Sequence, residues 1–120
     1  MTPESPPEHL VALVDEFLAT FPEGAEIATD ESCYGAGLCA DASGDLVEYA
    51  AECHGWRGWV VAWITSRTVA PWVTKVNPHP SYPSDVLEGH AVALFGEWVV
   101  DLTARQFAPS LPFPFYWRVS

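Results

Sequence analysis

Basic residues are scarce in this chain of 120 residues, which has 5 Lys and Arg against 16 Asp and Glu and a formal net charge of -11. Such a charge repels phosphate backbones and anionic lipid over long range, so we expect no nucleic-acid partner. The acidity is consistent with a solubilising surface, and also with an acidic face that recognises a basic partner.

Long apolar runs are also missing, since no window reaches the roughly 18 apolar residues that span a bilayer. The N-terminal MTPESPPEHL lacks the basic and apolar regions of a signal peptide. We therefore expect a cytoplasmic protein without membrane contact. The cysteines are Cys33, Cys39 and Cys53, an odd number that argues against a disulfide framework and directs attention to a reactive thiol.

What is abundant is apolar surface, because hydrophobic residues make up 49% of the chain. This length and composition predict a single domain over residues 1–120, with a flexible lead at 1–7. Apolar residues at helical spacing predict one helix over 7–21 and a second over 38–53. Gly44 lies inside the second helix, which suggests that another element packs close to its backbone.

Strand-like composition fills the second half of the chain. Residues 59–65 are β-branched and aromatic and predict a central strand, and residues 70–76 are a candidate neighbour limited by Pro71. Residues 90–94 and 97–103 predict a hairpin, and PFPFYWRVS at the C-terminus predicts one more strand. Helices before strands indicate an α+β fold, in which N-terminal helices pack on an antiparallel sheet of about four to five strands.

The hairpin brings a histidine close to a carboxylate. A turn at Phe95 and Gly96 places His90 directly opposite Asp101, with their Cβ atoms about 5 Å apart. A turn at Gly96 and Glu97 instead places His90 opposite Thr103, with Asp101 still a near neighbour. Either register allows the carboxylate to orient the imidazole and to stabilise its protonated form.

Cys39 lies in the predicted first turn of the second helix. Partial positive charge and unpaired N–H groups at a helix N-terminus lower a thiol pKa and can bind an oxyanion. A cysteine on the helix and a histidine on the sheet can then meet where the two layers touch. Cys33 is the rival nucleophile, because the helix start is defined only to within a few residues.

Two segments resemble the papain-like fold in its transglutaminase-like branch, which includes bacterial cysteine peptidases, arylamine acetyltransferase-like enzymes and deamidating toxins. GLCADAS at 37–43 is similar to the family's Gly-x-Cys helix start. GHAV at 89–92 and WVVDLTARQF at 98–107 are similar to its histidine strand and its Asp-x-Thr strand end. The resemblance implies Cys39 as nucleophile, His90 as general base and acid, and Asp101 as the orienting carboxylate.

The implied activity is thiol-dependent acyl transfer on an amide or thioester of a protein or peptide, with peptidase, deamidase and transglutaminase outcomes left open and no cofactor. Trp56, Trp98 and Gln106 are candidate substrate contacts, the two tryptophans in an apolar cleft near the thiol. The alternative function is a non-catalytic interaction module, of phage or mobile-element origin, with an acidic binding face.

A zinc site is the weakest of the hypotheses considered. His54 follows Cys53 directly and His79 lies in a Pro-rich loop, but no CxxC or HxxxH spacing presents two ligands together. We therefore expect no metal.

Overall fold

The structure, a computed structural model, describes residues 5–21, 26, 39–63, 90–106 and 109–119, with the backbone alone at 39–40 and 61–63. The predicted strand at 70–76 and the rival nucleophile Cys33 lie outside these residues. The fold is α+β, as predicted, with two helices packed against a four-stranded antiparallel sheet. No helix in the described ranges is both long and apolar enough to cross a membrane.

Helix α1 spans Glu8–Thr20 and buries a stripe at helical spacing, formed by Leu10, Leu13, Val14 and Phe17. Pro7 precedes its first turn, and the Pro7 carbonyl accepts the N–H groups of Leu10 and Val11. Proline suits this position because the N–H groups of the first turn have no partner within the helix.

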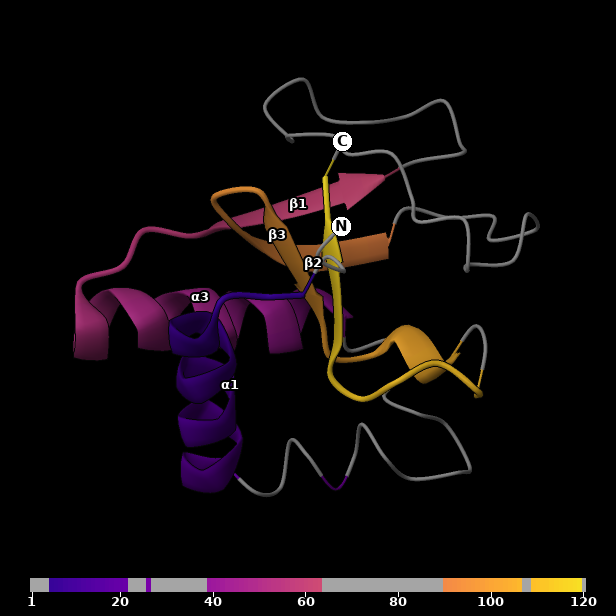
Figure 1. Ribbon diagram of the computed structural model, residues 1–120, viewed down its shortest axis with the longest axis horizontal. Helices are drawn as coiled ribbons and strands as arrows, with labels where there is room; N and C mark the ends of the chain where they lie inside the picture. Colours follow the sequence, from indigo (N-terminus) through magenta and orange to yellow (C-terminus); the bar gives the residue numbers. More distant parts are fainter. Residues whose placement is uncertain (1–4, 22–25, 27–38, 64–89, 107–108, 120) are drawn as a thin grey trace.

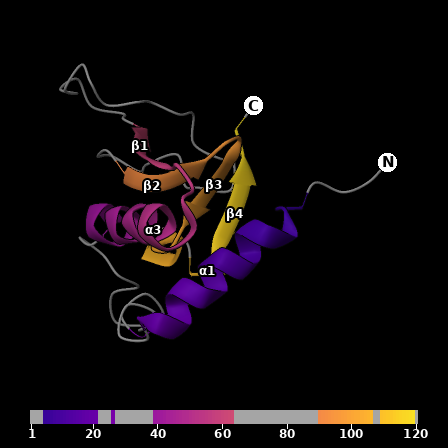
Figure 2. The same cartoon turned by 90° about the vertical axis from the view of Figure 1, so that its left-hand side faces the viewer.

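Helix α3 spans Cys39–His54 and buries Ser43, Leu46 and Ala50 against the sheet. Among the described residues no other element comes within 4 Å of the position that a Cβ at Gly44 would occupy, so the close packing expected there is not found among them. The axes of α1 and α3 cross steeply, as Figure 1 shows. In the view of Figure 2, α3 is seen almost end-on while α1 runs across the picture.

The sheet is formed by β1 (Trp59–Trp63), β2 (His90–Phe95), β3 (Trp98–Asp101) and β4 (Phe115–Arg118), in the order β1-β2-β3-β4. Among the described strands β1 pairs with β2 alone, and Trp59 and Val60 are exposed. The candidate neighbour at 70–76 lies outside the described residues, so the central position of β1 stays a prediction. A short 3-10 helix, η1 (Ala104–Gln106), follows β3.

Side chains alternate between two clusters on the two faces of the sheet. Ala93, Phe95 and Val100 join the stripe of α1 and the buried residues of α3 in the first cluster. Val92 and Val99 belong to the second cluster, on the opposite face, with residues of β4 and of the segment before it. The two helices therefore cover one face of β2 and β3, and the C-terminal segment covers the other.

The hairpin register corrects the principal prediction. Phe95 pairs with Trp98 and Ala93 with Val100, so the turn lies at Gly96 and Glu97. Gly96 adopts φ +61°, which glycine tolerates at the start of a tight turn. Phe95 is buried in the first cluster and stays in the strand, which excludes a turn that uses Phe95.

Candidate functional site

His90 and Asp101 form a buried pair at the end of the sheet farthest from the hairpin turn. His90 Nε2 lies 2.7 Å from Asp101 Oδ2, and each side chain is only 1% exposed. Because a carboxylate can only accept, Nε2 is the donor of this hydrogen bond. The bond therefore leaves Nδ1 as the ring nitrogen for any proton transfer by the neutral imidazole.

The pair forms across a diagonal of the sheet. Extending the observed register places Thr103 opposite His90 and Asp101 opposite Val92. His90 and Asp101 are then neighbours two positions apart on one face, about 7 Å apart at this kind of spacing, which their side chains can bridge. The predicted contact between His90 and Asp101 is present, but in the alternative register, with the turn at Gly96 and Glu97.

Thr103, which follows the end of β3, also holds the Asp101 carboxylate in place. The Thr103 N–H donates to Asp101 Oδ1 at 2.9 Å, and the Thr103 hydroxyl lies 3.5 Å from the same oxygen. One carboxylate oxygen thus faces the backbone of residue 103 and the other faces the imidazole. Removing two ionisable groups from water costs several kcal/mol per charge, so this burial requires a specific compensating geometry.

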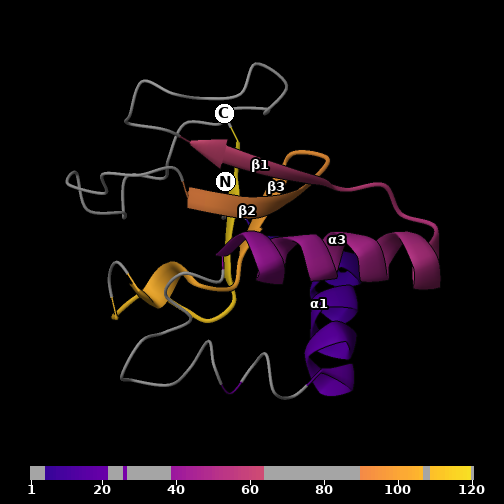
Figure 3. The same ribbon diagram turned by 180° about the vertical axis from the view of Figure 1, so that it is seen from behind.

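The backbone of Cys39 begins α3, in agreement with the prediction that this residue lies in a first helical turn. One turn later, the Ser43 hydroxyl donates to the Ala91 carbonyl at 3.2 Å, which fixes this end of the helix against β2. Figure 3 shows that α3 begins on the side where β2 begins and runs in the same direction.

The position of Cys39 relative to His90 follows from these two observations. Four helical residues before Ser43 correspond to about 6 Å, and about 6 Å along a strand is two residues before Ala91. The backbone of Cys39 is therefore about one strand residue before the level of His90, the first residue of β2. Alternation along β2 assigns His90 to the face of Val92, so a thiol from α3 must approach the imidazole past the end of the strand.

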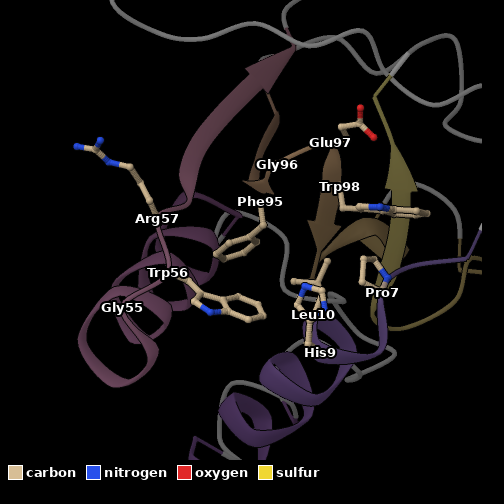
Figure 4. Close-up of a pocket in the computed structure, with 10 residues that line it drawn as sticks. All are labelled: Pro7, His9, Leu10, Gly55, Trp56, Arg57, Phe95, Gly96, Glu97 and Trp98. Carbon is tan, nitrogen blue, oxygen red and sulfur yellow. The ribbon is translucent and has the colours of Figure 1, made fainter.

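Trp56 and Trp98, the predicted cleft residues, line one groove of about 610 Å³ together with Phe95 and His9. The His9 ring meets the Trp56 ring edge to face, with centroids 4.8 Å apart. Figure 4 shows these rings converging between the start of α1 and the hairpin.

This groove does not adjoin Cys39, contrary to the expectation of a cleft near the thiol. Trp56 follows the last residue of α3, whereas Cys39 is its first, and α3 has 16 residues. At 1.5 Å per residue the two ends of the helix are about 22 Å apart. A molecule held in this groove would therefore lie far from Cys39.

Gln106, the third predicted substrate contact, belongs instead to the surroundings of Asp101. Its Nε2 donates to the Thr103 hydroxyl at 3.0 Å, and its side chain is half-buried. Sequence reasoning missed Thr103 as a partner of Asp101. The Asp-x-Thr spacing was the available signal for Thr103, because such a residue can bond a carboxylate two positions earlier.

His54 and Cys53, two residues considered for a zinc site, lie at the C-terminal end of α3. His54 binds Glu16 across the two helices at 2.7 Å, and Cys53 beside it is exposed. Among the described residues, no three His, Cys, Asp or Glu side chains gather closely enough to hold a metal ion. His79 lies outside the described residues.

Comparisons with family models, with curated proteins and with solved structures find no match for this chain.

Proposed function

We propose that the protein is a thiol-dependent acyltransferase of the transglutaminase-like type, with Cys39 as nucleophile, His90 as base and acid, and Asp101 as the orienting carboxylate. The observation that carries the proposal is the buried hydrogen bond between His90 and Asp101. A buried pair of ionisable side chains is often a marker of functional sites, and here it lies within about one strand residue of the level of a cysteine at a helix start.

In the proposed reaction, His90 Nδ1 takes the proton of the Cys39 thiol while Sγ attacks the carbonyl carbon of an amide. The N–H groups at the start of α3 stabilise the oxyanion of the tetrahedral intermediate. The C–N bond then breaks, the amine leaves with the proton from His90, and a thioester remains on Cys39. Water, deprotonated by His90, attacks the thioester and releases the acid, which makes amide hydrolysis the default outcome.

Labelling by iodoacetamide tests the proposal, in a Cys53→Ser background because Cys53 is exposed. We expect one thiol to react rapidly near neutral pH, with a reactivity midpoint well below about 8.5. Cys39→Ala should abolish this reaction and Cys33→Ala should preserve it. Loss of the reaction in Cys33→Ala alone would transfer the nucleophile to Cys33.

A histidine comparison isolates the role of the imidazole. His90→Gln should slow the labelling, because the imidazolium that holds the thiolate is lost. His54→Gln is the matched control, since His54 is paired with a carboxylate at the same 2.7 Å but on the outer surface of the helices. Equal effects of the two changes would remove the reason for assigning His90.

A second candidate function, an interaction module with an acidic face, is favoured by one feature of α3. Asp41, Asp45, Glu48 and Glu52 are all exposed and follow the spacing of a single helical stripe. Like charges at this spacing destabilise a helix, so a basic partner would compensate them. Uniformly slow thiols, together with binding of a basic peptide that weakens with salt, would favour this module over the enzyme.

A further inference from the structure

A chain of hydrogen bonds leads from Gln106 to His90. Gln106 Nε2 donates to Thr103 Oγ1 at 3.0 Å, Thr103 contacts Asp101 Oδ1 through its N–H and its hydroxyl, and Asp101 Oδ2 accepts from His90. We infer that Gln106 and Thr103 are positioning residues for His90, acting through the Asp101 carboxylate. The chemical role of His90 in this inference rests on the proposed function, whereas the positioning does not.

The chemistry of these side chains determines which atom donates and which accepts in each hydrogen bond of this chain. The Thr103 oxygen accepts the Gln106 amide, so its single proton is available for Asp101. At 3.5 Å this hydroxyl bond is weak, and the 2.9 Å bond from the Thr103 N–H is the main anchor of the carboxylate.

Gln106 acts on that main anchor because it is attached to Thr103 twice. Its backbone N–H donates to the Thr103 carbonyl at 3.2 Å, and its side-chain amide bonds the Thr103 hydroxyl. The two bonds close the turn through η1 and hold the backbone of Thr103 in place. Asp101 Oδ1 is thereby fixed to the turn, and Oδ2 is directed at the imidazole.

The consequence for the imidazole is a fixed orientation. With Nε2–H donated to a carboxylate that cannot swing away, the ring keeps Nδ1 in one place for proton transfer. Gln106 therefore contributes without touching a substrate, in contrast to its predicted role as a substrate contact.

The rate at which the His90 ring N–H proton exchanges with water tests this positioning. NMR on protein with isotope-labelled histidine rings measures that rate. The resonance is assigned by its loss in His90→Gln, and all measurements use a Cys39→Ala background so that thiol chemistry does not contribute. We expect Gln106→Met and Thr103→Val each to accelerate exchange roughly fivefold, the factor that corresponds to about 1 kcal/mol for one lost hydrogen bond. Thr103→Ser retains the hydroxyl and should stay within about twofold of the parent.

Ser43→Ala is the matched control, because it removes an equally buried hydroxyl whose bond goes to Ala91. It should leave the exchange rate unchanged. Gln106→Asn, which keeps the amide but is too short to reach Thr103, replaces Gln106→Met if that variant does not fold. Unchanged exchange in the Gln106 and Thr103→Val variants, with only a loss of thermal stability, would overturn the inference. Slow Cys39 labelling alone would refute the acyl-transfer proposal and leave the positioning intact.

Discussion

Asp101→Asn is the substitution that most directly tests the buried pair. The new side chain has nearly the same shape, and its oxygen can still accept the Thr103 N–H at the Oδ1 position. Its amide nitrogen then faces His90 Nε2 at the 2.7 Å that now joins a donor to a carboxylate. Two donors oppose each other, so the imidazole must change tautomer or lose its partner.

We expect Asp101→Asn to lower the free energy of unfolding by about 3 kcal/mol, the upper end of the range for leaving a buried polar group without its hydrogen bond. For a chain of this size that corresponds to a fall in Tm of about 12 °C. Urea and thermal unfolding at neutral pH, followed by circular dichroism, measure both quantities.

Glu97→Gln is the control, because it replaces a carboxylate by an amide in an exposed ion pair. Glu97 binds Arg118 at 2.7 Å, but the two side chains are 64% and 43% exposed. Water screens such a pair, so its loss should cost less than about 1 kcal/mol. If Asp101→Asn costs no more than Glu97→Gln, then the His90–Asp101 pair is not held in the buried geometry described above.

Three further predictions concern β4, helix α3 and the hairpin. Burial, with a smaller contribution from Asp15, raises the pKa of the Tyr116 phenol; its contribution to stability is therefore complete below about pH 10 and lost as the pH rises further. Unfolding of Tyr116→Phe should show a weaker decline above that pH, and identical declines would contradict this. Glu48→Lys should stabilise the protein by about 0.5 kcal/mol at low salt, by relieving the acidic stripe of α3, and should do so less in 1 M salt, as urea titrations can measure. Gly96→Ala should cost about 1 kcal/mol through its positive φ alone, since its Cβ meets nothing within 4 Å, and Gly96→Asn should cost less in the same assay.

The sequence predicted the elements well where one local signal decided the structure. The stripe of α1 and the helix start at Cys39 follow from apolar spacing of three and four residues, which needs no knowledge of the rest of the fold. The contact between His90 and Asp101 was predicted because both registers of the hairpin bring these residues near each other.

The errors arose where distant parts of the chain decide the outcome. The register depended on whether Phe95 is needed in the core, and its burial is a property of the packed helices. The expected packing against Gly44 also depended on elements far away in the sequence.

The separation between the aromatic groove and the buried pair has a consequence for catalysis. The groove contains Phe95 at one end of β2, and His90 stands at the other, so five strand residues place them about 16 Å apart. A small amide substrate cannot span this distance or the roughly 22 Å between the two ends of α3, whereas an extended peptide of about seven residues can. If the groove assists the proposed reaction at all, Trp56→Ala should raise KM for a long peptide and leave KM for a short amide unchanged. Equal effects on both substrates would mean that the substitution disturbs the fold of the site, and not the binding of a distant part of the substrate.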